Sequence, residues 1–373
     1  MLSSLATDRA QLADLDAQIS DLRFEHSLPA LRSQKQLVQE RLYSYKYPVL
    51  TLPNEIIAEI FIHFLPIYPL CPPLTGPYSP TLLTQICREW QEIAVATPGL
   101  WRSLSFDTES LVPLTQQRHI CHNWLTRSRS CPLSIEFGDS DMPLALAAGI
   151  AHRVRWEYLK LTLSRSYLPV IDGPMPLLRH LDLTLDDGLD VTTKFPEAPL
   201  FRSLTLYYFA ASSKVVLPWA QLTSVTLHSI YRHEYVAALR QASRLVHCEL
   251  NISFDEEDSS TEAPLEHGID LLHLESLALS PTPLSLPWLG WLQDFITPAL
   301  RSLRVAEKSL MPEPVDTLSS FISKSGCKLQ KLRVTGTRTV SKGSYRKAFP
   351  SIQLSFDSNE EIDSHSDWEI SPE

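Results

Sequence analysis

One short pattern, apolar-x-x-apolar-x-apolar, returns along most of this 373-residue chain and limits what it can fold into. The copies are WEYLKL at residue 156, LRHLDL at 178, FRSLTL at 201, LTSVTL at 222, LVHCEL at 245, LESLAL at 274, LRSLRV at 300, LQKLRV at 329 and FPSIQL at 349. Their starts are 20 to 29 residues apart, enough for one strand plus a helix or turn. Alternating apolar residues have the two-residue period of a strand that buries one face. The pattern predicts a stack of such units.

Two earlier segments fit the same series. Residues 101–106 follow the template, and Leu133, Ile135 and Phe137 alternate like a neighbouring strand. Short helices are expected at 235–240 and 317–322. The units resemble irregular leucine-rich repeats and lack the Asn turn of regular ones. The predicted fold class is α/β (α+β overall), with a parallel sheet in a solenoid over residues 103–356; a parallel β-helix is the alternative.

Polar residues stand between the repeated leucines and should face outward on the strands. A rigid row of polar groups on a stacked sheet is where repeat proteins hold their partners. A merely solvated face is the alternative for each single residue. The candidate target-binding residues are Lys160, Asp182, Tyr207, His228, Glu249, Arg304 and Arg333.

The first 47 residues have apolar residues at helical spacing. Leu5, Leu12 and Ile19 are seven apart, and a second series continues after Pro29. Pro29 is expected to end the first helix near Ser27, which predicts a helical hairpin or a short coiled coil over residues 1–47. The hairpin either packs on the rest of the chain or mediates self-association through residues 2–45.

The segment from Leu52 to Trp101 is the most informative. LPNE places a Pro at the first helical position, and a wide apolar stripe follows as far as Leu65. Ser79-Pro80 opens a second predicted helix that continues to Pro98. Two short helices with faces this wide carry more apolar surface than they can bury on each other, which favours a docking face or a packed neighbour.

LPNEIIAEIFIHFLP, ICREWQEIA and TPGLW together resemble the F-box, and the flanking YKYPVLTLPNEI and NWLTRSRSCPLSIEF resemble F-box-like proteins of mushroom-forming fungi. The resemblance covers about residues 45–135. It implies a three-helix module, here residues 48–102, that docks on the Skp-type adaptor of a cullin–RING ubiquitin ligase. The proline-rich linker at residues 66–80 is longer than in the family pattern.

The resemblance also implies which residues contact the adaptor. They are Leu52, Pro53, Ile56, Ile57, Ile60, Phe61, Leu65, Cys87, Trp90, Leu100 and Trp101. The alternative is that these side chains only build a small core against the next domain.

The distribution of charge and the pattern of cysteines indicate which partners and which cellular compartment to expect. The formal charge is −10, but residues 357–373 hold seven acids and no Lys or Arg, and five more lie between Asp255 and Glu262. Without them the chain carries +2, so no clustered positive charge is available for nucleic acid. We expect an acidic flexible tail at 357–373, no nucleic-acid binding and no membrane span. Six cysteines without a CxxC pair, and no signal-type amino terminus, favour the cytoplasm or nucleus.

Catalytic and cofactor motifs are not found in the sequence. GxSxG, a Walker loop and HExxH are missing, and eleven glycines are few for a nucleotide-binding fold. His119, Cys121 and His122 are too close together to face one ion, and the spacing of Asp182, Asp186, Asp187 and Asp190 fails the EF-hand rule. We therefore expect no enzyme activity, no cofactor and no metal.

The leading functional prediction is a substrate-recognition subunit of an SCF-type ubiquitin ligase, in which the helical module binds the Skp-type adaptor and through it the cullin. The repeats would then hold a protein target of unknown identity. The alternative is a repeat scaffold outside the ubiquitin system that self-associates through its amino-terminal helices. A third, remote possibility is a carbohydrate-active β-helix enzyme, which would need clustered acids on one strand face.

Overall fold

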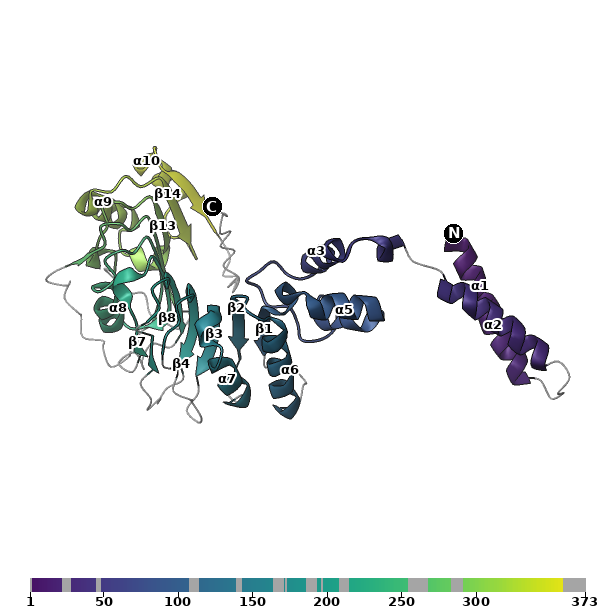
Figure 1. Cartoon of the computed structure of the whole chain (residues 1–373). Coiled ribbons are helices and arrows are strands. Elements are labelled where there is room, and N and C mark those ends of the chain that lie inside the picture. Colours follow the sequence, from purple (N-terminus) through teal and green to yellow (C-terminus); the bar gives the residue numbers. More distant parts are fainter. Residues whose placement is uncertain are drawn as a thin grey trace. The chain divides into compact units, whose positions relative to one another are not determined.

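The computed structural model of the chain is shown in Figure 1. It describes residues 2–21, 28–44, 48–106, 114–138, 143–163, 171, 173–185, 193–195, 197–207, 215–253, 268–282 and 291–357. The chain divides into one unit of Met1–Phe64 with Leu82–Thr97 and a second of Leu65–Thr81 with Pro98–Glu373. The predicted module of residues 48–102 is therefore divided between the two units, and the predicted tail lies outside the described residues apart from Asp357.

The first unit begins with the predicted helical hairpin, formed by α1 (Leu2–Asp21) and α2 (Leu28–Ser44). Leu15 and Val38 are buried, and an ion pair of 2.9 Å between Arg41 and Asp8 links the two helices. Pro29 lies in the first turn of α2, where its missing N–H costs nothing, whereas α1 already ends at Asp21.

Three short helices follow: α3 (Asn54–Phe64), α4 (Pro80–Ile86) and α5 (Arg88–Ala96). The prediction of one helix from Ser79 to Pro98 was wrong, because Cys87 is extended (φ −157°, ψ 166°) and separates α4 from α5. The predicted start is confirmed: the Ser79 hydroxyl accepts a hydrogen bond of 3.2 Å from the Thr81 N–H. Single-turn 3-10 helices, η1 (Pro48–Thr51) and η2 (Pro98–Trp101), flank the three helices.

The second unit is built on an eleven-stranded sheet in which every described ladder is parallel. Each strand pairs with the next main strand along the chain, in the order β1-β2-β3-β4-β6-β8-β9-β11-β13-β14-β15. All eleven predicted segments contribute a strand, which confirms the α/β class. The strands are β1 (Ser103–Phe106), β2 (Leu133–Phe137), β3 (Trp156–Leu163), β4 (His180–Leu185), β6 (Ser203–Tyr207), β8 (Ser224–Ile230), β9 (His247–Ile252), β11 (Ser276–Pro281), β13 (Ser302–Ala306), β14 (Lys331–Thr335) and β15 (Gln353–Phe356).

The connections between strands are of two kinds. Five contain an α-helix: α6 (Leu114–Arg127), α7 (Pro143–Ile150), α8 (Arg232–Leu239), α9 (Pro314–Ser325) and α10 (Lys342–Ala348). Helices α8 and α9 fulfil the two helix predictions and lie on the same side of the sheet (Figure 1). In the other connections, the described residues include 3-10 turns and the short parallel ladders β5 (Thr193–Lys194) with β7 (Val215–Val216) and β10 (Ile269–Asp270) with β12 (Phe295–Ile296). The unit thus combines the helical turns of the predicted repeat with the extended turns of its β-helix alternative.

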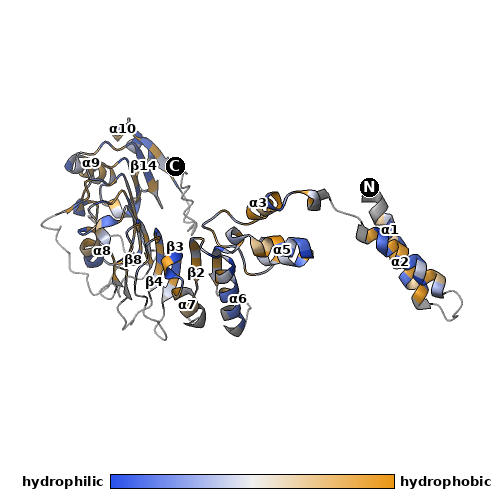
Figure 2. Cartoon of the chain, viewed as in Figure 1, coloured by the Kyte–Doolittle hydropathy of each residue, from blue (hydrophilic) through white to orange (hydrophobic). Residues whose placement is uncertain are grey.

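The repeated leucines form the core of this unit. The strand register aligns a row of apolar residues from Leu159 on β3 to Leu332 on β14, and each residue of this row is at most 4% exposed. The hydrophobic and hydrophilic residues alternate along the strands (Figure 2), so one face is buried and the other is polar. None of the described helices is both long and apolar enough to cross a membrane.

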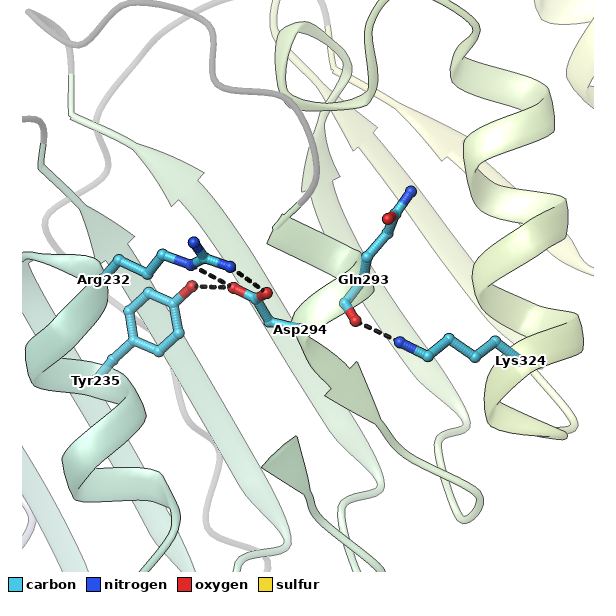
Figure 3. A network of polar contacts seen from close by, with 5 residues as sticks. All are labelled: Arg232, Tyr235, Gln293, Asp294 and Lys324. Carbon is cyan, nitrogen blue, oxygen red and sulfur yellow. Dashed lines mark hydrogen bonds and ion pairs between the residues drawn. The ribbon is translucent and has the colours of Figure 1, made fainter. Parts of the chain in front are cut away.

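A buried ion pair joins two distant connections of the sheet unit (Figure 3). The Arg232 guanidinium, at the start of α8, donates two hydrogen bonds of 2.9 and 2.6 Å to the carboxylate of Asp294 in η7 (Trp291–Asp294). The Tyr235 hydroxyl donates a third, of 2.9 Å, to the same carboxylate. On the far side, the Lys324 ammonium of α9 donates to the backbone carbonyl of Gln293. These bonds fix α8 and α9 to the connection between β11 and β13.

Candidate functional site

The first candidate site lies on α3. Ile57 and Phe61 are almost completely buried, and the Phe61 ring packs edge-on against Trp90 of α5, with ring centroids 4.9 Å apart. Ile56 and Ile60, one turn apart, are by contrast 49% and 47% exposed, and Leu52 just before the helix is 39% exposed. Leu52, Pro53, Ile56 and Ile60 are called the α3 surface below. The helix is mainly hydrophobic and is interrupted by hydrophilic residues such as Glu55 and Glu59 (Figure 2).

The eleven predicted adaptor residues thus separate by burial. Ile57, Phe61, Leu100 and Trp101 are at most 1% exposed, so their side chains do not lie on a surface as the prediction required. Leu65, Cys87 and Trp90 are half-buried. The four residues of the α3 surface remain exposed.

Trp101 has a structural role within the sheet unit. Its ring packs edge-on against Trp124 of α6 at 5.3 Å, and the Arg127 guanidinium lies 4.4 Å above it. The family pattern could not reveal this burial, because α6 is separated from Trp101 in sequence. Two exposed apolar residues, Ile86 of α4 and Val95 of α5, were not among the predicted adaptor residues. Of the two, Ile86 belongs to the apolar helical series of this segment, whereas Val95 lies outside it.

The second candidate site is the polar face of the sheet. The strand register aligns one residue from each of eight sheet strands, β3 to β14, into a central row: Lys160, Asp182, Thr205, Thr226, Glu249, Ala278, Arg304 and Arg333. Five of the seven predicted target-binding residues belong to this row. Tyr207 and His228 are register partners in the adjacent row, and their rings stack at 4.2 Å with 4° between the planes. The predicted residues therefore share one face, which neighbouring strands only about 4.8 Å apart bring together.

The charged residues of the central row differ in the interactions that they make. Glu249 accepts a hydrogen bond of 2.9 Å from Arg304, two strands away, because the small Ala278 on β11 between them leaves space. Arg333 forms an ion pair with Asp357. Asp182 differs: burial raises its pKa to about 6, a shift opposed by nearby Lys160 and supported by Glu136. Its Oδ1 is buried and has no hydrogen-bond partner among the described residues.

The proline-rich segment Leu65–Thr81 packs on the amino-terminal strands of the same sheet. The Tyr68 hydroxyl donates a 2.7 Å hydrogen bond to Glu157, and its ring packs edge-on against Tyr158 at 5.5 Å. The Arg102 guanidinium lies 3.8 Å above the Tyr68 ring. The Ser134 hydroxyl donates a 2.7 Å hydrogen bond to the Pro69 carbonyl. Tyr158 and Ser134 are register partners, so this segment covers the polar face at β2 and β3.

The described residues hold no group of three or more His, Cys, Asp or Glu side chains placed to bind a metal ion. Cys121 is buried, which raises its pKa to about 12, and all six cysteines are free. The Asp186, Asp187 and Asp190 positions considered for calcium lie outside the described residues.

The chain matches no protein-family model and no curated protein sequence.

Proposed function

We propose that the chain is a substrate-recognition subunit of an SCF-type cullin–RING ubiquitin ligase, without enzyme activity of its own. In this proposal the helices α3 to α5 dock on a Skp-type adaptor and the sheet unit holds a protein target. The gain for the reaction is proximity, since a held target presents its lysines to the ligase at high effective concentration.

The observation that carries the proposal is the α3 surface. Ile56 and Ile60 stay about half exposed although Ile57 and Phe61 beside them are sealed in the core. Exposed aliphatic side chains at i and i+4 form one stripe on a helix, and such stripes are typical of contacts with another protein. They also occupy positions at which the F-box resemblance expects adaptor contacts.

The Ile56→Asp exchange tests this site. A carboxylate in the centre of an apolar contact loses its hydration without a partner, which costs a few kcal/mol and lowers affinity by about a hundredfold. Pull-down with purified adaptor should therefore lose the complex. Because Ile56 is exposed, the helices should still fold, which circular dichroism can verify.

Leu272→Asp is the matched control, because Leu272 is 59% exposed and lies in the sheet unit. It should keep full adaptor association. Wild-type protein that fails to bind the adaptor would refute the proposed function. An Ile56→Asp variant that still binds it would refute the α3 surface as the contact.

A further inference from the structure

Among the described residues, the proline-rich segment covers the polar face of the sheet at its amino-terminal strands. Tyr68 and Pro69 occupy the positions above Tyr158 and Ser134, so β2 and β3 are covered by the chain itself. The next strand is β4, whose central-row residue is Asp182. From β4 to β9 the row holds Asp182, Thr205, Thr226 and Glu249, all half-buried.

Asp182 has a carboxylate oxygen, Oδ1, that lies beneath the surface and accepts no hydrogen bond from the residues that the structure describes. Asp182 as a whole is half-buried, so an external donor would approach the carboxylate from the side of its other oxygen, Oδ2. A buried polar atom without a partner costs free energy, and more so when it carries charge. Burial raises the pKa of Asp182, while its register partner Lys160 on β3 opposes this shift and Glu136 on β2 supports it.

The surroundings of Asp182 suit one class of ligand. Tyr207 is on β6, which lies between β4 with Asp182 and β9 with Glu249 in the strand order. Burial raises the pKa of its phenol, and both carboxylates add to this shift. The Tyr207 and His228 rings stack on each other across β6 and β8, so the outer face of Tyr207 is directed towards β4, the strand of Asp182. A planar guanidinium combines stacking on aromatic rings with hydrogen bonds to carboxylates, which an ammonium does less well.

We propose that the polar face from β4 to β9 binds an arginine-bearing segment of a protein partner, with the guanidinium donating to the Asp182 carboxylate and stacking on the outer face of Tyr207, whose other face is covered by His228. This inference specifies the target class within the proposed function, but peptide binding can be measured without the adaptor. The basic residues Arg304 and Arg333 lie at the other end of the row, where they are paired with Glu249 and Asp357.

The test is fluorescence anisotropy of the full chain with labelled nine-residue peptides. The probes alternate Gly with Arg, Lys or Glu, so that length and composition are matched. The Arg peptide should bind most tightly and the Glu peptide should not bind. Asp182→Asn removes the charge at nearly constant volume and should weaken Arg-peptide binding about tenfold or more. Asp270→Asn, an equal charge change at an exposed residue on β10, should leave it unchanged.

The pH dependence of Arg-peptide binding provides a second readout. Arg-peptide affinity of the wild-type chain should fall when the pH drops from 7.5 to 5, because Asp182 becomes protonated. The Asp182→Asn variant should lack most of this change. His228 and His180 also face this region, but burial lowers the pKa of both, that of His180 to about 4, so His180 stays mostly neutral over this range.

Equal losses in Asp182→Asn and Asp270→Asn, or equal binding of the Arg and Glu peptides, would overturn the inference. Ile56→Asp should leave peptide binding intact. A chain that binds the Arg peptide but not the adaptor would retain this inference and lose the proposed function.

Discussion

The buried pair of Arg232 and Asp294 allows a quantitative test of what holds the sheet unit together. Asp294 is 1% exposed and its carboxylate accepts three hydrogen bonds, two from Arg232 and one from Tyr235. Removing the cation by Arg232→Met leaves the carboxylate buried with only the tyrosine. The loss of one partner of a buried ion pair costs about 3–5 kcal/mol of unfolding free energy.

The double exchange Arg232→Met with Asp294→Leu should recover most of that loss. Neither side chain then carries a charge, and replacing a whole buried pair by apolar residues is often neutral. Tyr235→Phe removes a single hydrogen bond to a charged acceptor and should cost about 1.5–3 kcal/mol. Burial and the Asp294 carboxylate both raise the pKa of Tyr235, so its phenol remains a donor at neutral pH.

Urea denaturation followed by tryptophan fluorescence measures these differences, together with the slope of the transition as a check on two-state unfolding. Lys331→Met, at an exposed residue of β14, serves as the charge-matched control and should change the free energy of unfolding by less than about 0.5 kcal/mol. An Arg232→Met variant as stable as the control would refute the view that this ion pair is buried away from water.

Two further predictions concern single side chains. Burial raises the pKa of Glu307, but hydrogen bonds from the Thr339 and Val340 N–H groups and from two hydroxyls outweigh it and lower the pKa. Glu307 therefore stabilises the folded state at pH values above the ordinary carboxyl pKa, and this contribution is lost as the pH falls through the lowered pKa. The Glu307→Gln variant should accordingly lose less stability than the wild type when the pH is lowered. Tyr68→Phe removes the 2.7 Å bond to Glu157 and should speed amide hydrogen exchange in residues 65–81 without changing that of β13 and β14.

The periodic features of the fold could be predicted from the sequence. Every segment of the form L-x-x-L-x-L contributes a strand, because alternating leucines are stable only where one face of a strand is buried. The outward position of Lys160, Asp182 and their equivalents follows from the same period. The break at Cys87 could not be predicted, since no Gly or Pro marks it and the apolar spacing continues through it.

What the sequence alone determined is therefore which residues alternate, which helices are amphipathic and which residues stand opposite the leucines, since these depend on neighbours within a few positions. Only the tertiary structure decided that Trp101 packs against Trp124, that the proline-rich segment lies on β2 and β3, and that Asp182 Oδ1 has no donor in the described part of the chain. These outcomes depend on contacts between residues up to about ninety positions apart, and local patterns carry no information about such contacts.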